Sequence, residues 1–181
     1  MGTPKALLEL AGETFLDRLI LTLGQSCCPV IVVLGCDHQS IRAGLRRADS
    51  ATFVLNPDYR RGQLSSLQCG LAAVSREAEG VMFTPVDCPS VLSSTMARLA
   101  RRFQARGPHE LLVIPRSEGR RGHPVCAARD LIPEFLALPP DAQARDVIHR
   151  HSEHTVYVDV DDSGILTDVD DPQAYRRLTD G

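Results

Sequence analysis

The sequence has little net charge, no long apolar run and no paired-cysteine motif, and each absence argues against a class of protein. Its 20 Lys and Arg residues nearly balance its 23 Asp and Glu residues, so a broad basic face for nucleic acid is not expected. No apolar run approaches the roughly 20 residues that cross a bilayer, so we expect no membrane partner. The six Cys residues form no C-x-x-C motif, which predicts a reduced, cytoplasmic protein without structural disulfides or a zinc knot.

Three well-known catalytic and nucleotide-binding motifs are missing as well. The chain has no G-x-S-x-G elbow, no pair of His residues at metal-ligand spacing and no full Walker loop.

What the chain does have is a regular alternation of strand-like and helix-like segments. Its 181 residues, 43% of them hydrophobic, suffice for one domain with a substantial core. Strands are predicted at residues 29–34, 52–55, 81–84, 111–114, 124–127 and 155–158. Helices are predicted after a Thr14 cap and at residues 41–48, 64–78, 94–106, 131–138, 144–151 and 172–178. This order predicts a single α/β domain over residues 1–181, with three αβα layers around a mostly parallel sheet.

In such folds ligands bind at the carboxyl ends of strands, and Asp87 lies just after the strand predicted at 81–84. It sits between Pro85 and Pro89, which makes the segment rigid. Mg²⁺ prefers one or two carboxylates plus substrate phosphates, so Asp87 is a candidate metal ligand. Taken alone, a turn-forming or helix-capping Asp is an equally good interpretation.

A second group of carboxylates lies near the end of the chain. Asp171 and Pro172 suit the N-cap and first position of the last helix. Asp168 and Asp170 are not needed for that role, and residues spaced by two on an extended chain face the same side. Asp170 is therefore predicted to share a metal ion with Asp87 if the fold brings the two segments together.

The first residues look like the second half of a phosphate-binding loop. Gly2 permits backbone shapes closed to other residues, and Pro4 fixes its own φ. Lys5 then supplies a charge of the kind that pairs with phosphate oxygens. The alternative interpretation is an ordinary solvated lysine near a terminus.

Two further loops carry residues that could contact a ligand. Gly62, Ser65 and Ser66 lie where a loop enters the helix predicted at 64–78. Free amides at a helix start can bind an anion or a base edge, although the serines could equally cap the helix. Gly122 and His123 lie in a tight turn between strands, and a His without a nucleophile beside it is interpreted as structural or as a substrate contact.

Five segments together resemble the MobA-like nucleotidyltransferase family, and within it the molybdenum cofactor cytidylyltransferase branch. They are residues 1–8, 56–67, 87–89, 119–124 and 168–174. No one segment is specific, but all five occur in the family's order and extend over nearly the whole chain.

The resemblance implies a Rossmann-like nucleotidyltransferase fold and a Mg²⁺-dependent transfer of a nucleoside monophosphate from an NTP, with release of pyrophosphate. It favours CTP as donor and the phosphate of a molybdopterin-type cofactor as acceptor, with a molybdoenzyme or its maturation factor as a protein partner. Lys5 would neutralise triphosphate oxygens, and Asp87 and Asp170 would hold the metal ion. The residues expected to contact nucleotide or acceptor are Gly2, Lys5, Gly62, Ser65, Ser66, Gly122 and His123.

Two alternatives stay open beside this reaction. One is transfer to another phosphorylated acceptor, such as a sugar or alcohol phosphate. The other is a non-catalytic protein that binds a nucleotide or the cofactor without turnover.

The sequence also departs from the family pattern in three places, one of which, the close of the last segment at Gln173-Ala174, is expected to affect helix capping only. The family's opening strand and the first glycines of its loop have no counterpart, so we expect a chain shortened at its N-terminus, with unpaired backbone groups on neighbouring strands. A family Gly-Ala-Arg segment reads Gln143-Ala144-Arg145, and Gln would be strained at a position that requires positive φ.

Overall fold

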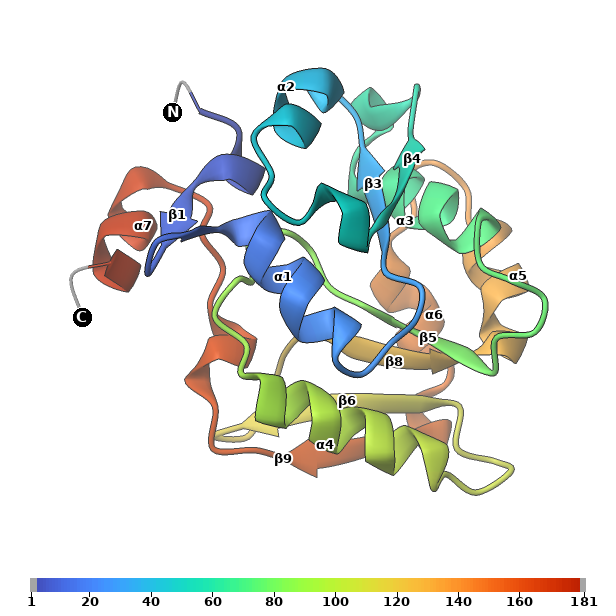
Figure 1. The fold of residues 1–181 in the computed structure, drawn as a ribbon. Helices are drawn as coiled ribbons and strands as arrows, with labels where there is room; N and C mark the ends of the chain where they lie inside the picture. The colour runs from blue at the N-terminus through green and yellow to red at the C-terminus, as the bar shows by residue number, and fades with distance from the viewer. Residues whose placement is uncertain (1–2, 180–181) are drawn as a thin grey trace.

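The structure is a computed structural model that describes residues 3–179. Its strands are β1 (Glu9–Leu10), β2 (Glu13–Thr14), β3 (Ile31–Leu34), β4 (Thr52–Leu55), β5 (Gly80–Phe83), β6 (Leu112–Ser117), β7 (Arg120–Arg121), β8 (Val125–Ala128) and β9 (Thr155–Asp159). Its α-helices are α1 (Phe15–Gly24), α2 (His38–Ala43), α3 (Gln63–Ala72), α4 (Ser93–Gln104), α5 (Ile132–Leu136), α6 (Ala144–Arg150) and α7 (Pro172–Thr179). The predicted alternation of strands and helices is confirmed (Figure 1).

The sheet is mixed rather than mostly parallel. Strand β3 pairs with β4 and β6 pairs with β9 in parallel, whereas β8 runs antiparallel to both β5 and β6. The reason is the short β6–β7 hairpin, which reverses the chain and returns β8 between β5 and β6. The α/β prediction is thus confirmed, and its description of the sheet is corrected.

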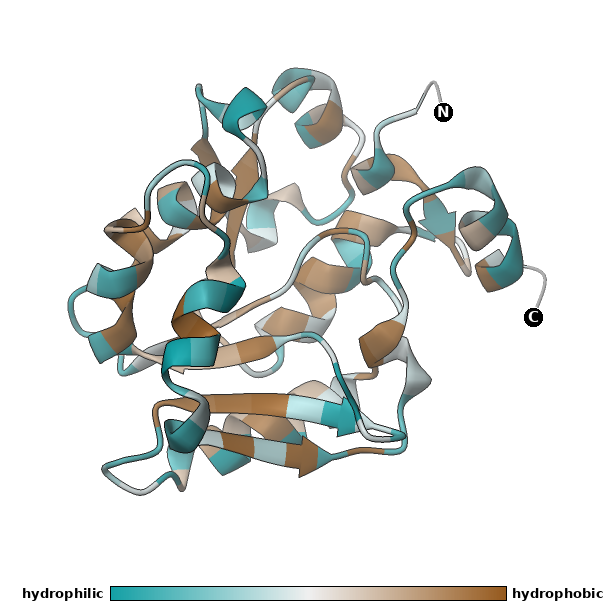
Figure 2. Ribbon diagram, turned by 180° about the vertical axis from the view of Figure 1, so that it is seen from behind, coloured by the Kyte–Doolittle hydropathy of each residue, from teal (hydrophilic) through white to brown (hydrophobic). Residues whose placement is uncertain are grey.

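Side-chain alternation along β6 shows how two helical layers cover the sheet. Leu112 and Ile114 are buried in a cluster with residues of α3, α5 and α6, and Val113 between them is buried in a cluster with α4. Because successive strand residues point to opposite faces, these helices lie on opposite sides. Figure 1 shows α1 and α4 together on the near face, and Figure 2 shows apolar residues concentrated in the strands. The three-layer prediction is therefore confirmed.

Helices α1 and α3 connect the β3–β4 pair to the larger sheet. Within residues 3–179, β3 pairs only with β4 and β5 pairs only with β8. Helix α1 packs on Val32 through Leu16 and belongs to a second cluster with Met82 of β5. On the opposite face, α3 packs against β3 and belongs to the cluster that includes Val81. Hydrophobic packing by these two helices holds the two strand groups in one layer.

Several local predictions can be compared with the structure directly. Thr14 caps α1 by accepting a 3.0 Å hydrogen bond from the Asp17 amide, as predicted. The helix predicted at 41–48 is wrong in position, because α2 begins after Asp37, whose φ is +56°, and ends at Ala43. Helix α3 stops at Ala72, since the carbonyls beyond it turn to bind the guanidinium of Arg129.

The expected strain at Gln143 is not found. Its φ of −127° is ordinary extended backbone, and its amide donates a 2.8 Å hydrogen bond to Asp146 in a capping box. Gln at this position therefore stabilises the start of α6.

The two ends of the described chain lie side by side (Figure 1). The Tyr175 hydroxyl of α7 donates a 2.8 Å hydrogen bond to the Glu9 carbonyl of β1, and its ring packs on Phe15. This contact brings the segment around Lys5 close to the one that precedes α7.

Two sequence expectations concern the environment of the protein. Its six cysteines are free thiols, as predicted. No helix within residues 3–179 combines the length and hydropathy needed to traverse a bilayer. The cytoplasmic location stays a prediction.

Asp17 is the most deeply buried carboxylate that organises a loop. Its side chain is 1% exposed and accepts hydrogen bonds from the Thr14 hydroxyl and from the amides of Arg46 and Arg47. It thereby ties α1 to the segment that follows α2.

We expect Asp17→Ala to lower the free energy of unfolding by about 3 kcal/mol, because it leaves buried backbone amides without an acceptor. Urea denaturation would measure the change. The control is Asp141→Ala, at an exposed loop position, which should stay within about 0.5 kcal/mol of the parent. Equal stability of the two variants would contradict this account of Asp17.

Candidate active site

Two loops that are far apart in sequence meet at the candidate site. The first carries Asp87 after β5, and the second carries residues 168–170 before α7. The amide of Val169 donates a 3.1 Å hydrogen bond to the Asp87 carbonyl, and its fully buried side chain anchors the second loop. Buried Asp162 joins the same two loops, because its carboxylate accepts from the amides of Leu92 and Gly164. The positions of the carboxylates are thus set by the backbone.

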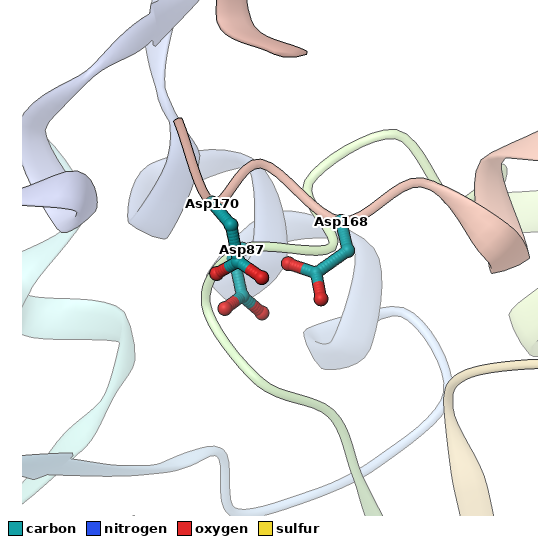
Figure 3. A group of neighbouring side chains, drawn as sticks. All are labelled: Asp87, Asp168 and Asp170. Carbon is teal, nitrogen blue, oxygen red and sulfur yellow. The ribbon is translucent and has the colours of Figure 1, made fainter. Parts of the chain in front are cut away.

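Three carboxylates converge where these loops meet. Oxygens of Asp87, Asp168 and Asp170 all lie within 4.8 Å of one another. Figure 3 shows the three side chains turned toward a common region. The predicted pairing of Asp87 with Asp170 is found, and Asp168 joins it because residues 168 and 170 face the same side while Val169 faces the core.

Lys5 is the cation at this cluster. Its Nζ lies 2.7 Å from Asp170 Oδ1 and 3.6 Å from Asp87 Oδ2. The interpretation of Lys5 as an ordinary solvated lysine is therefore wrong. Gly2, predicted to contact the ligand, lies outside the described residues.

The charges of the cluster change one another's pKa values. Partial burial lowers the pKa of Lys5, but its hydrogen bond to Asp170 and the nearby carboxylates outweigh burial and raise it. Burial and the charges of Asp87 and Asp170 raise the pKa of Asp168, whereas the hydrogen bond from Lys5 lowers that of Asp170. The excess of negative charge makes the cluster a candidate site for an additional cation.

The cluster lines an open polar cavity of about 570 Å³. One end carries the three carboxylates, and another part of the wall comes from the β7–β8 turn. The further lining residues are Gln63, Pro85, Cys88, Arg120, Arg121, Gly122, His123, Ile165 and Leu166. The predicted residues Gly122 and His123 are therefore beside the carboxylates.

The backbone of His123 is fixed by a hydrogen bond, whereas one nitrogen of its ring has no hydrogen-bond partner within residues 3–179. Its amide donates a 3.0 Å hydrogen bond to the Ile165 carbonyl. Its Nδ1 is buried and has no hydrogen-bond partner among residues 3–179. Burial lowers the pKa of His123 against the opposing charge of Asp87, which favours the neutral ring. A neutral imidazole can donate or accept one hydrogen bond toward a ligand.

Gly62, Ser65 and Ser66 do not line the cavity, although Gln63 between them does. Gly62 has a φ of +96° and precedes α3, while Asn56 Nδ2 donates to the hydroxyls of Ser65 and Ser66 at 3.0 and 3.1 Å. Neither serine caps α3, which begins at Gln63 without a side-chain cap. A nucleotide contact by these three residues stays a prediction.

The structure adds residues that the sequence did not assign to the site. For Asp168 the signal is its spacing by two from Asp170, which puts both carboxylates on one side of an extended chain. Gln63, Arg120 and Arg121 line the cavity because of tertiary packing, and their sequence pattern alone gives no reason to single them out.

An αβα fold with three carboxylates at a polar cavity, two of them bonded to a lysine, is typical of nucleotide-transferring α/β enzymes. The sequence model of the MobA-like NTP transferase domain matches residues 1–155, and the chain belongs to this family. The chain is therefore an enzyme of the nucleotidyltransferase type. That a single domain of this family extends over residues 1–181 stays a prediction.

Relatives support the same assignment. The chain is 23% identical over 175 residues to the molybdenum cofactor cytidylyltransferase of Escherichia coli, covering 97% of this chain and 86% of that protein. The crystal structure of Rv0371c from Mycobacterium tuberculosis has a TM-score of 0.85 at 28% identity, covering 100% of this chain and 91% of that one. A structure of Rv0371c in complex with manganese has a TM-score of 0.82 at 27% identity, covering 99% and 94%. The resemblance to the cytidylyltransferase branch is confirmed.

Gly122→Ala should disturb the site without touching a charged residue. A Cβ at Gly122 would lie 2.2 Å from the Ile165 carbonyl oxygen, so the β7–β8 turn must move away from the loop that leads to Asp168. We expect a loss of about 2–4 kcal/mol in the free energy of unfolding, measured by urea denaturation. Gly107→Ala is the matched control, because its Cβ would meet nothing closer than 3.8 Å. Unchanged stability of Gly122→Ala would show that this close approach is unimportant.

Proposed function

We propose that this enzyme transfers CMP from CTP to the phosphate of a molybdopterin-type cofactor in a Mg²⁺-dependent reaction that releases pyrophosphate. The observation that carries the proposal is the convergence of Asp87, Asp168 and Asp170 with Lys5 at one cavity, in a chain of this family. The E. coli relative's name supports both the cytidylyl donor and the molybdenum cofactor acceptor.

The residues present fit a divalent ion. The three side chains supply only oxygen donors, which suit Mg²⁺ and Mn²⁺, and their oxygens are close enough to share one ion. The manganese complex of Rv0371c supports this choice of ligand type. When bound, the ion would neutralise phosphate charge and orient the triphosphate.

The chain's own residues account for the rest of the transfer. Lys5, which carries a positive charge at neutral pH, would pair with triphosphate oxygens once they displace it from Asp170. An oxygen of the acceptor phosphate forms a bond to the α-phosphorus, and the bond from that phosphorus to the β-phosphate oxygen breaks. The electron pair leaves with pyrophosphate, so no protein nucleophile is required. His123, which lines the same cavity, would contact the substrate there.

Removing one carboxylate tests the metal site. We expect Asp87→Asn to weaken Mn²⁺ binding at least tenfold in calorimetry and to slow pyrophosphate release from CTP plus cofactor by about 100-fold. Asp161→Asn is the matched control, because Asp161 is exposed, lies in the neighbouring loop and does not line the cavity. Full pyrophosphate release by Asp87→Asn would reject catalysis at this site and favour a carrier role.

Nucleotide preference tests the choice of donor. Calorimetry with CTP, GTP, ATP and UTP in the presence of Mg²⁺ should show CTP binding most tightly. Lys5→Met should weaken CTP binding by about tenfold, because it removes a charged partner of the phosphates. Equal affinity for all four nucleotides would count against the cytidylyl assignment. If the enzyme transferred CMP to a sugar phosphate and not to the pterin cofactor, the proposed acceptor would be wrong, whereas the proposed donor and reaction type would stand.

A further inference from the structure

The cavity has a basic side opposite in charge to its carboxylates. Arg120 and Arg121 line it together with Asp87, Asp168 and Asp170. Figure 2 shows β6, which leads into this hairpin, changing from brown to teal toward its end. One cavity therefore joins a cation-binding cluster to a pair of guanidinium groups.

The hairpin that carries the two arginines has a defined shape. Its turn residues Glu118 and Gly119 have φ values of +51° and +76°, which match a two-residue type I′ turn. Arg121 pairs with Arg116 and Arg120 with Ser117 across the ladder. The close packing of Gly122 on Ile165 then fixes the hairpin beside the loop that leads to the carboxylates.

Arg121 is also oriented by Tyr157 of β9. Its Nη1 donates a 3.2 Å hydrogen bond to the Tyr157 hydroxyl, and its guanidinium lies 5.8 Å from the ring centroid. The stem of Arg121 is therefore restrained, and less side-chain freedom is lost when its remaining donors bind a ligand.

Arg116, which lies opposite Arg121 in the hairpin, differs from Arg120 and Arg121 because a carboxylate neutralises its charge. It forms a bidentate pair with Asp159 at 2.6 and 2.9 Å. By contrast, neither Arg120 nor Arg121 forms an ion pair with a carboxylate within residues 3–179. Two arginines of one hairpin that line the same cavity without carboxylate partners offer forked donors that match phosphate oxygens.

We propose that Arg120 and Arg121 bind the phosphate of the acceptor. This inference rests on the proposed function, in which a phosphate must be brought to the α-phosphorus of a nucleotide held at the carboxylates. The triphosphate already has Lys5 and the acidic cluster with its divalent ion as partners. The arginines face the same cavity from the hairpin, so they would hold the second anionic substrate and reduce its repulsion from the first.

Two probes distinguish the acceptor phosphate from the triphosphate of the nucleotide: inorganic phosphate stands for the first, and CTP for the second. Calorimetric titrations in saturating Mg²⁺ would compare wild type, Arg120→Met, Arg121→Met, Arg121→Lys and the control Arg101→Met, an exposed arginine of α4 that does not line the cavity. Mn²⁺ titration of each variant would check that the acidic cluster is intact. Both hairpin arginines are exposed, so we expect the variants to fold.

Arg120→Met and Arg121→Met should each weaken phosphate binding about tenfold, with a smaller loss in Arg121→Lys. Affinities for CTP and Mn²⁺ should stay within about twofold of wild type. Phosphate affinities equal to that of Arg101→Met would overturn the proposal, as would a tenfold loss of CTP affinity, which would assign the arginines to the nucleotide. Wild-type protein that binds phosphate through these arginines but binds no CTP would reject the proposed function and leave the anion site standing.

Discussion

Repulsion among three neighbouring carboxylates is the constraint on which the rest of the site depends. Asp87, Asp168 and Asp170 are held with oxygens within 4.8 Å of one another, and Lys5 supplies the one cation bonded to them within residues 3–179. A single ammonium leaves the cluster negative, and burial together with the charges of Asp87 and Asp170 raises the pKa of Asp168. The fold must therefore hold these side chains against repulsion, and in the proposed reaction a divalent ion and its anionic ligand would complete the balance.

The restraint comes from backbone and core contacts, which do not depend on charge. Val169 buries its side chain and bonds the Asp87 carbonyl, while Asp162 bridges the loops on the other side. The contact of Tyr175 with Glu9 draws the N-terminal segment to the same place. Each functional side chain thus stands next to a residue that fixes its backbone, as pre-organised catalysis requires.

Charge also divides the cavity. Asp87, Asp168 and Asp170 line one part of it, with Lys5 bonded to two of them, and Arg120 and Arg121 of the hairpin line another part. A reaction between two anions needs each of them neutralised and held in order, and a cavity with both kinds of charge can do this without a covalent intermediate. The sequence has no nucleophile motif, and the cavity is open and polar. Both observations fit a reaction without a covalent enzyme intermediate.

The sequence by itself determined the local elements, because hydrophobic period and capping residues act over a few positions: Thr14, strand β4 and the cap at Asp171 are where the pattern placed them. It also indicated Lys5, Asp87 and Asp170 through their residue types and motifs. Only the tertiary structure decided that Asp168 joins them, that β8 runs antiparallel, that α3 ends at Ala72 and that the arginine hairpin faces the carboxylates. Those features arise from contacts between segments as far apart as residues 5 and 170, and such contacts leave no periodic trace in the chain.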